Sequence, residues 1–524
     1  MNISIKNLNN CKNLSSNKIL EMAKKAEMKY TYDMETLEEE SKSRSGSGSD
    51  SETKKKVCNS IEKTINDINP CGVVLYDDTK LSIKKHQLNV ANYLVKNRGV
   101  IVVHSVGTGK TLSAISTAQC LLIKKIISHV IVITPTSLQE NFKSQAKMYG
   151  LSDDELSKIY TFYTIQGIVN AIENHDVKSP SNSLVIIDEA HNLRTLGGTR
   201  FDNIFKYVKR AHKIMLLTAT PLINYKYDII NLISLINGEK PISIDKFEMM
   251  LENGDLTEFK NYVSGVFSFY SKDQTKPDPN FPSKKILDIF LPMTQDYYKT
   301  YIGVENGQVS KIPDFKGKNI HVFYNGLRRA SNIIDKISPK VDWIIDKIKS
   351  EPKSKFVIFS HFINMGIKPV MKWLDAHNKK YCYVTGDLSI SDRKEAVDKY
   401  NSNEVRILFL SKAGGEGLDL KGTNYIIIME PAWNEGSIEQ IIGRGVRYKS
   451  HEGLSKSKKN VTIYRLYCVK PDEYKAINKI TSKILLEYNN NMLSVDLYLR
   501  NYAWLKQQEI ISFYKILNKF KIDK

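Results

Sequence analysis

The chain has few cysteines, and they are not arranged as a metal site or a disulfide framework would require. Its six cysteines are spread over 524 residues without a CxxC pair or a Cys/His cluster. This scatter argues against a zinc site and against the disulfide framework of a secreted protein. We therefore expect a protein of a reducing compartment. The cysteines are Cys11, Cys58, Cys71, Cys120, Cys382 and Cys468.

Long apolar runs are also missing. None approaches the roughly 18 residues of a membrane span, so we expect a soluble protein without a membrane partner. The opening segment MNISIKNLNNCKNLSSNK lacks the apolar stretch of a signal peptide, and none is expected. What the chain has in excess is positive charge, with a formal net charge of +20. Such an excess favours a polyanionic partner, and nucleic acid is favoured over an anionic membrane surface. The alternative explanation of the charge is a general richness of the chain in Lys, Asn and Ile.

From about residue 73, short β-branched runs alternate with helical periods. The first four runs, GVIVVHS, HVIVITP, SLVIIDEA and KIMLLTAT, begin at residues 99, 129, 183 and 213. Such runs, each followed by a helical period, indicate buried parallel strands with crossover helices, which is an α/β fold. Four further runs lie at 355–362, 380–387, 405–412 and 424–431, with a helical window at 391–401.

The repeated pattern predicts two tandem parallel-sheet domains in a chain too long for one core. A stretch of Ser, Gly and charge at 35–56 is predicted to be a disordered linker after a short helix at 18–34. Three prolines mark 271–285 as loop. The predicted parts are an N-terminal extension (1–57), a first domain (73–240), an inter-lobe region (241–329), a second domain (330–470) and a basic helical tail (471–524).

The segment VVHSVGTGKT at 102–111 has the strand, glycine loop and helix that a phosphate-binding loop needs. Gly107 and Gly109 allow the backbone N–H groups to approach phosphate oxygens. Lys110 is expected to neutralise the β and γ phosphates and Thr111 to ligate Mg²⁺. His104 stands where the general pattern has glycine, so the generic match is incomplete. The expected nucleotide-binding loop comprises His104, Ser105, Val106, Gly107, Thr108, Gly109, Lys110 and Thr111.

The segment SLVIIDEAH at 183–191 is an apolar strand that ends in two acids. Burying two carboxylates is costly unless a cation is present. We expect Asp188 to hold Mg²⁺ and Glu189 to orient or deprotonate the attacking water.

These residues resemble the motifs of the superfamily 2 helicases and translocases. GTGKT, DEAH, LTATP, SKAGGEGLDL and QIIGRGVRYKSH occur in the order of motifs I, II, III, V and VI across about residues 80–452. The resemblance implies two RecA-like domains that bind ATP between them and a nucleic acid across both. It also implies that Gln87 lies near the adenine. Nucleic-acid or coupling roles are implied for Pro135, Thr136, Thr218, Thr220, Gly415 and Gly417.

In the second domain, Gln440, Arg444 and Arg447 are spaced four and three residues apart, which would place them on one face of a helix. We expect the two guanidinium groups to act as arginine fingers on the γ-phosphate. With Lys110, Asp188 and Glu189 these residues form the expected catalytic set. The complete set argues against a degenerate scaffold that binds ATP without hydrolysing it.

The finer resemblance is to the ATPases of poxviruses and other large nucleocytoplasmic DNA viruses, and PAWNEGSIEQIIGRGVR resembles the Swi/Snf-type arrangement. It implies a helicase or translocase linked to transcription, located in the host cytoplasm at the viral factory or packaged in the virion. The alternative is an ATPase subunit of a transcription initiation or termination factor that does not unwind strands, with a viral RNA polymerase as a partner. From residue 440 onward, 17 Lys and Arg face 7 Asp and Glu, which supports phosphate contacts. DNA or RNA preference and oligomeric state stay open.

Overall fold

The chain folds into two compact units. Unit 1 contains residues 1–222, 226–271 and 515–524, and unit 2 contains residues 223–225 and 272–514. The computed structural model describes residues 11–25, 34, 38, 51–68, 71, 83–105, 107–195, 198–223, 225–253, 256–270, 280–309, 320–412, 418–455 and 458–522.

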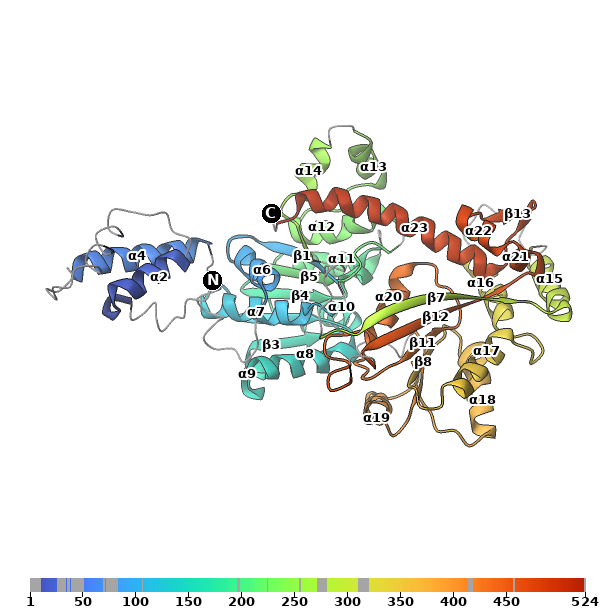
Figure 1. Cartoon of the computed structure of the whole chain (residues 1–524). Helices are drawn as coiled ribbons and strands as arrows, with labels where there is room; N and C mark the ends of the chain where they lie inside the picture. The colour runs from blue at the N-terminus through green and yellow to red at the C-terminus, as the bar shows by residue number, and fades with distance from the viewer. Residues whose placement is uncertain are drawn as a thin grey trace. The chain divides into compact units, whose positions relative to one another are not determined.

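Unit 1 is built on a six-stranded sheet in which every pair is parallel, in the order β3-β2-β4-β5-β1-β6 (Figure 1). The four predicted apolar runs of this part are confirmed as β1, β2, β4 and β5. All side chains of these four strands are buried, which explains why their sequences are continuous apolar runs. The bounds are β1 (Gly99–His104), β2 (His129–Ile133), β3 (Tyr160–Tyr163), β4 (Ser183–Asp188), β5 (Lys213–Thr218) and β6 (Phe267–Tyr270).

Helices cover both faces of this sheet. Apolar side chains of α6, α7 and α8 pack with one face in a single core cluster, while α12 packs against β1 and β5. Ser152 begins α9 with a capping box in which its hydroxyl accepts from Glu155 N at 3.2 Å. The helices are α6 (Lys85–Lys96), α7 (Lys110–Ile123), α8 (Thr136–Tyr149), α9 (Asp153–Ile159), α10 (Ile165–Glu173), α11 (Thr199–Val208), α12 (Ile230–Asn237), α13 (Ile244–Glu252) and α14 (Thr257–Val263).

Unit 2 contains a second parallel six-stranded sheet, in the order β7-β12-β11-β8-β10-β9. The predicted runs of the second domain are confirmed as β8, β9, β10 and β11. The edge pair β7 and β12 is longer, with ten residues in register. The bounds are β7 (Ser283–Pro292), β8 (Phe356–Phe359), β9 (Cys382–Val384), β10 (Ile407–Leu410), β11 (Tyr425–Ile428) and β12 (Asn460–Val469).

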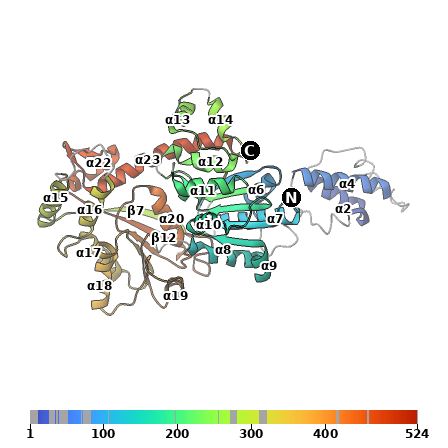
Figure 2. The same ribbon diagram turned by 180° about the vertical axis from the view of Figure 1, so that it is seen from behind.

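The second sheet is also covered on both faces, as Figure 2 shows from behind. α17 and α18 pack on one face, and α19 and α20 on the other. The tail forms helices around a small hairpin of β13 (Glu487–Tyr488) and β14 (Asn491–Met492). The helices are α15 (Gln295–Val309), α16 (Ile320–Asn332), α17 (Pro339–Ser350), α18 (Lys368–Ala376), α19 (Ile390–Asn401), α20 (Glu435–Gly445), α21 (Pro471–Lys475), α22 (Ile477–Lys483) and α23 (Val495–Leu517).

Together these sheets confirm the predicted α/β fold with two tandem parallel-sheet domains. Residues 241–329, predicted as a region between the lobes, are shared by the units: α13, α14 and β6 belong to unit 1, and β7, α15 and α16 to unit 2. The predicted loop 271–285 is wrong at its end, because Ser283 to Lys285 pair with β12. The last proline of that segment, Pro282, comes just before the strand, where its missing N–H does not interrupt the ladder.

Two helices precede the first sheet, α2 (Ser16–Lys25) and α4 (Ser51–Ile68), and they pack together through apolar side chains. The helix predicted at 18–34 is confirmed over its first part by α2. The predicted linker 35–56 is wrong for residues 51–56, which form the first turns of α4; of the rest, only Glu38 is described. The apolar residues Val57 and Ile61 of α4, just beyond the linker, supply its buried face.

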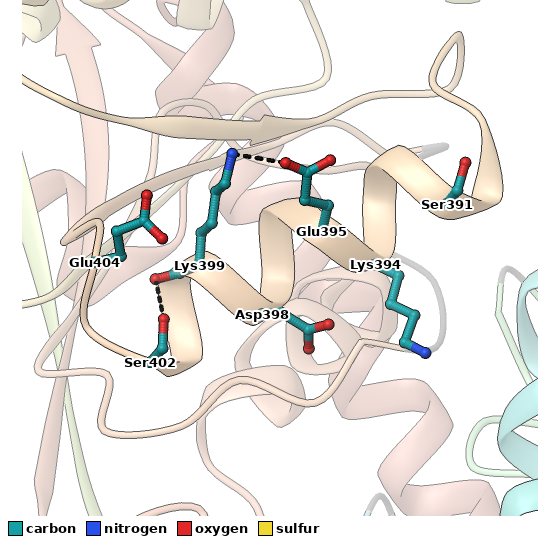
Figure 3. A pocket seen from close by; sticks show the side chains of 7 residues that line it. All are labelled: Ser391, Lys394, Glu395, Asp398, Lys399, Ser402 and Glu404. Atoms are coloured by element: carbon teal, nitrogen blue, oxygen red, sulfur yellow. Dashed lines mark hydrogen bonds and ion pairs between the residues drawn. The ribbon is translucent and has the colours of Figure 1, made fainter.

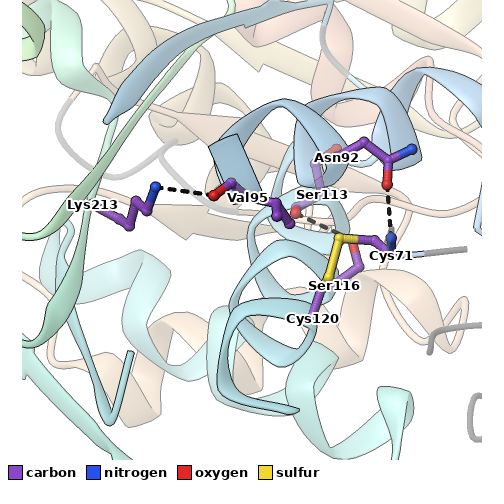
Figure 4. The surroundings of a disulfide bond; sticks show 7 residues. All are labelled: Cys71, Asn92, Val95, Ser113, Ser116, Cys120 and Lys213. Atoms are coloured by element: carbon purple, nitrogen blue, oxygen red, sulfur yellow. Dashed lines mark hydrogen bonds between the residues drawn. A yellow bond between two sulfur atoms is a disulfide. The ribbon is translucent and has the colours of Figure 1, made fainter. Parts of the chain in front are cut away.

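The sequence argument against a disulfide framework is wrong for four of the six cysteines. Cys11 is bonded to Cys58 beside α2 and α4, and Cys71 is bonded to Cys120 of α7. Figure 4 shows the second pair, where Asn92 Oδ1 accepts a hydrogen bond from Cys71 N at 2.8 Å. The bonded cysteines are 47 and 49 residues apart in the sequence, so no local spacing motif predicts these pairs.

Some predicted site residues fall outside the part of the chain that the structure describes, namely Val106, Gly415 and Gly417. Within the described part, no helix combines the length and the hydropathy needed to cross a bilayer.

Candidate active site

The predicted motifs of unit 1 gather at one edge of its sheet because they follow parallel strands. The phosphate loop follows β1, Pro135 and Thr136 follow β2, the acid pair ends β4, and Thr218 ends β5. The carboxyl ends of parallel strands meet at the same edge, which is where open α/β sheets bind ligands. A hydrogen bond joins the ends of β2 and β4, since Thr134 Oγ1 donates to Asp188 Oδ2 at 3.5 Å.

The phosphate loop has the backbone geometry that its sequence predicts. Gly107 and Gly109 have positive φ angles of 78° and 86°, and α7 begins at Lys110 directly afterwards. The helix N-terminus therefore adds its partial positive charge at the loop. Lys110 Nζ donates to the carbonyl of His104 at 3.2 Å, so its ammonium group lies across the loop.

Helix α6 holds this loop from the side through two consecutive residues. Gln87 Nε2 donates to the carbonyls of Thr108 and Gly109 at 3.4 and 3.2 Å, and Gln87 Oε1 accepts from Lys84 N at 2.9 Å. His86 Nε2 lies 3.3 Å from the same Thr108 carbonyl. Gln87 is 2% exposed. A Cβ atom added to Gly109 would lie 2.5 Å from Gln87 Nε2, which is too close for a real contact. The amide of Gln87 thus contacts the loop, and its predicted proximity to adenine stays a prediction.

His104 replaces the usual glycine and is fully buried at the end of β1. Its Nε2 lies 3.0 Å from Ser268 Oγ on β6, and its ring is 5.1 Å from the ring of His86. His86 in turn stacks on Tyr270 with ring centroids 3.6 Å apart. Burial, with the nearby charges of His86 and Lys110, lowers the pKa of His104 to about 3. Burial lowers the pKa of His86 to about 4. Both imidazoles are therefore neutral at neutral pH.

The acid pair lies at the end of β4, with Asp188 8% exposed. Asp188 Oδ1 accepts a hydrogen bond from Glu189 N at 2.9 Å. Burial and the neighbouring Glu189 raise the pKa of Asp188 to about 6, although the charge of Lys110 opposes them. A buried acid in this state favours a cation beside it. Glu189 itself adopts a left-handed backbone conformation with φ of 51°, a strained state that is typical of functional sites.

A chain of contacts leads from the acid pair to motif III. His191 Nδ1 lies 3.2 Å from Glu189 Oε2 and 3.3 Å from Thr218 Oγ1. The same Thr218 oxygen accepts from Thr220 N at 3.1 Å. Glu189, His191, Thr218 and Thr220 therefore form one connected group at the ends of β4 and β5.

The residues predicted to meet a nucleic-acid backbone begin helix α8. Pro135 is the residue before the helix, and Thr136 is its exposed first residue. The free N–H groups at a helix N-terminus suit a phosphate oxygen. Within unit 1 these residues are separated from the phosphate loop in sequence but share its sheet edge.

In unit 2, helix α20 carries Gln440 and Arg444 one turn apart, both partly exposed. The prediction that Arg447 lies on the same helix is wrong, because α20 ends at Gly445 and Arg447 follows in a turn. There Ser450 Oγ accepts from Arg447 N at 3.3 Å and donates to Gly445 O at 3.1 Å. These competing hydrogen bonds end the helix early.

Arg447 links motif VI to motif V within this unit. Its Nη1 donates to the Leu418 carbonyl at 3.1 Å and lies 4.0 Å from Asp419 Oδ1. One helix turn earlier in the chain, the Arg444 carbonyl accepts from Leu420 N at 3.2 Å. The described end of motif V therefore fixes the backbone that presents both arginines.

A separate groove runs along α19 and is lined by charged side chains (Figure 3). Lys399 Nζ is paired with Glu395 Oε1 at 2.7 Å, so part of this charge is already satisfied. None of the predicted site residues lines the groove. Its lining residues are Ser391, Lys394, Glu395, Asp398, Lys399, Ser402 and Glu404.

Sequence reasoning missed the side chains that support the site. His86, Thr134, His191 and Ser268 each contact a predicted site residue. His86 directly precedes Gln87 and His191 is two residues after Glu189, so proximity in the sequence was a usable signal for both. Ser268 comes from β6, about 160 residues after the loop, and no local pattern points to it.

Taken together, a glycine loop between β1 and a helix and an acid pair at the end of β4, separated from β1 by β5 alone, define a P-loop ATPase site. Family models match three parts of the chain. They are "Type III restriction enzyme, res subunit" over residues 52–223, "SNF2-related domain" over 158–333 and "Helicase conserved C-terminal domain" over 339–449.

Curated relatives extend the match over most of the chain. A putative ATP-dependent RNA helicase of Acanthamoeba polyphaga mimivirus is 32% identical over 425 residues, covering 76% of this chain and 91% of the relative. A second protein of that name and virus is 25% identical, covering 72% and 80%. The early transcription factor 70 kDa subunit of Yaba monkey tumor virus is 25% identical, covering 83% and 79%. The chain belongs to the superfamily 2 helicases, which are nucleic-acid-dependent ATPases.

One similar solved structure is the Sulfolobus solfataricus SWI2/SNF2 ATPase core in complex with dsDNA. The alignment covers 84% of this chain and 97% of the chain in that structure. The sequence identity is 18% and the TM-score 0.35, and the family assignment does not depend on it.

Proposed function

We propose that this chain is an ATP-driven helicase or translocase that moves on DNA or RNA and serves viral transcription. The observation that carries the proposal is the contact chain from Glu189 through His191 to Thr218. It connects the group predicted to activate water with the motif predicted to couple hydrolysis to the nucleic-acid track.

ATP and Mg²⁺ fit the residues at the sheet edge. The loop N–H groups and Lys110 would bind the phosphates, while Thr111 and Asp188 would hold the Mg²⁺ ion. The buried Asp188, with its raised pKa, is the donor that a divalent cation satisfies. When bound there, Mg²⁺ neutralises charge on the β and γ phosphates.

Hydrolysis in this proposal uses Glu189 as general base. Its carboxylate takes a proton from the attacking water as that water's oxygen bonds to the γ-phosphorus and the bond to ADP breaks. Gln440 would help position the water or the γ-phosphate. Arg444 and Arg447, which belong to the other unit, would stabilise the charge that develops on the γ-phosphoryl group.

The proposed track is a phosphate backbone that the N-terminus of α8 meets at Pro135 and Thr136, with motif V residues Gly415 and Gly417 in a sensing role. The net charge of +20 supports this track. The proposal includes a viral RNA polymerase as partner and a location at the viral factory or in the virion. The viral origin of the relatives supports both.

The second candidate is an ATPase subunit of a viral transcription initiation or termination factor that does not separate strands. The match to an early transcription factor subunit over 83% of this chain favours it. Strand displacement tests whether the protein separates strands, as a helicase does and as a non-unwinding translocase or factor subunit does not. A labelled duplex with a single-stranded overhang should be unwound by a helicase when ATP is added. If no duplex is unwound but ATP still drives displacement of a third strand from a triplex, the protein translocates without unwinding.

A further inference from the structure

A fully buried ion pair lies at the start of the long C-terminal helix in unit 2. Lys340 Nζ of α17 lies 2.6 Å from Asp496 Oδ2 of α23, and both side chains are 0% exposed. Asp496 also accepts from Ser331 Oγ at 2.9 Å and from Cys468 N at 2.8 Å. Isolated buried charges are costly, so a pair this complete specifies one position for the helix start. None of these residues belongs to the predicted catalytic set.

The pair continues as a polar chain toward the segment that leads into α20. Lys340 Nζ donates to Asn332 Oδ1 at 2.8 Å, and Asn332 Nδ2 donates to Glu430 Oε2 at 3.0 Å. Glu430 is fully buried and also accepts from Ser360 Oγ at 3.0 Å. In the described part of unit 2, the side chain of Asn332 is what joins the ion pair to Glu430.

Glu430 lies five residues before α20, and contacts at Pro431, Trp433 and Glu435 fix the connecting segment. Arg328 Nη2 donates to the carbonyl of Pro431 at 3.0 Å. The ring of Trp433 meets Tyr324 of α16 and Tyr502 of α23 edge to face, at centroid distances of 5.2 and 6.1 Å. At the helix start, Glu435 Oε2 lies 2.9 Å from Arg465 Nη2 of β12.

We propose that α23 is a positioning element for the arginine helix α20, acting through the buried chain from Asp496 by Lys340 and Asn332 to Glu430 and through the Trp433–Tyr502 contact. This inference rests on the proposed ATPase function, in which α20 presents Gln440 and Arg444. We therefore assign Asn332, Trp433 and Tyr502 the role of positioning residues, which hold α20 and take no part in the reaction.

The test uses two substitutions in the full chain. Asn332→Leu breaks the polar chain at its middle, and Tyr502→Leu removes the ring that Trp433 meets on α23. The matched controls are Lys349→Met, on the exposed side of α17, and Leu505→Ala, a partly exposed apolar residue of α23. Steady-state ATP hydrolysis gives kcat and KM for each variant.

Both test variants should lower kcat at least about tenfold while the KM for ATP changes by less than about twofold, because small displacements of a catalytic group cost rate more than binding. Both controls should keep the wild-type kcat. A merely structural role would lower the melting temperature without this split. If Asn332→Leu fails to fold, Tyr502→Leu carries the test. A normal kcat in a folded test variant overturns the inference.

A second readout does not depend on activity. Amide hydrogen exchange over residues 435–445 should become about tenfold faster in the two test variants, while residues 390–401 of α19 keep their protection. Unchanged protection of α20 overturns the inference even if the wild type hydrolyses no ATP. Absence of ATP hydrolysis by the wild type, with α20 loosened in the variants, would instead contradict the proposed function.

Discussion

His191 Nδ1 lies 3.3 Å from Thr218 Oγ1 and 3.2 Å from Glu189 Oε2. One imidazole thus contacts both the acid expected to activate water and the first threonine of motif III. It is 9% exposed, so its position is set by the fold and not by solvent. We therefore expect a change at either neighbour to be transmitted to the other through this ring.

We expect His191→Ala to uncouple hydrolysis from the track. The ratio of nucleic-acid-stimulated to basal ATPase rate should fall by roughly tenfold, which corresponds to about 1.4 kcal/mol of lost coupling. The measurement is ATP turnover with and without saturating nucleic acid. His212→Ala, just before β5 and at the opposite end of that strand from Thr218, is the control. An unchanged ratio would show that the contact chain carries no coupling.

Glu189→Gln should bind ATP and hydrolyse it about 10² to 10⁴ times more slowly, because the amide cannot take the proton of the attacking water. Filter binding of labelled ATP and single-turnover hydrolysis measure the two steps separately. Glu140→Gln on exposed α8 is the matched control. Hydrolysis by Glu189→Gln at the wild-type rate would remove this residue from the water-activating role.

Gln87→Ala should weaken ATP binding by loosening the phosphate loop. Two hydrogen bonds to loop carbonyls are lost, each worth about 1 kcal/mol, so the Kd for ATP should rise by about tenfold or more. Measuring the Kd for GTP as well as for ATP distinguishes support of the phosphate loop from recognition of the base. A loss that is equal for both nucleotides fits the loop contact, whereas a loss confined to ATP fits contact with adenine.

The two buried histidines beside the phosphate loop should make unit 1 sensitive to acid. The folded-state pKa values of about 4 for His86 and about 3 for His104 lie below 6.5, the ordinary pKa of a histidine side chain. Between pH 3 and pH 6.5 the unfolded chain therefore binds more protons than the folded chain. The stability that is present above pH 6.5 is lost as the pH falls toward 3.

Denaturation by urea at pH 7.5 and pH 5 measures this loss. The difference between the two midpoints should shrink in His104→Gln, which keeps a hydrogen-bonding side chain toward Ser268 but does not titrate. An acid sensitivity equal to that of the wild type would mean that His104 contributes nothing to it.

Cys71→Ser should destabilise unit 1, because the bond to Cys120 closes a loop of sequence separation 49 in the unfolded chain. Loops of this length give about 4 kcal/mol in the chain-entropy account, and 2–4 kcal/mol is typical. Calorimetry with and without a reductant measures the change. The reductant should lower the melting temperature of the wild type more than that of the variant. Equal shifts would indicate that the bond is not formed in solution.

The sequence allowed the strands of both sheets to be predicted where burial on both faces makes an unbroken apolar run, as in β1, β4 and β8. It did not reveal the edge strand β7, SKKILDIFLP, whose side chains are only partly covered and include several charges. Edge strands β3 and β6 were missed because they are short and rich in aromatic residues that fit a helix as well.

The candidate site followed the same logic. Lys110 and Asp188 stand at strand ends, where local sequence places them, and the structure brings them to one edge. The supporting contacts of His104 with Ser268 and of Asn332 with Glu430 join residues about 100 or more apart. Such pairs depend on tertiary packing, as do the disulfides, and single-sequence periodicity carries no information on them.

The most direct test of the central claim is steady-state ATP hydrolysis by the purified protein with no nucleic acid, single-stranded RNA, single-stranded DNA or duplex DNA, with Lys110→Ala as the inactive control. We predict that one of these nucleic acids raises the wild-type rate at least about tenfold, that this stimulation falls steeply with salt, and that Lys110→Ala shows no turnover. A wild-type rate that is indifferent to all of them, or near-normal turnover by Lys110→Ala, would contradict a nucleic-acid-coupled motor at this site.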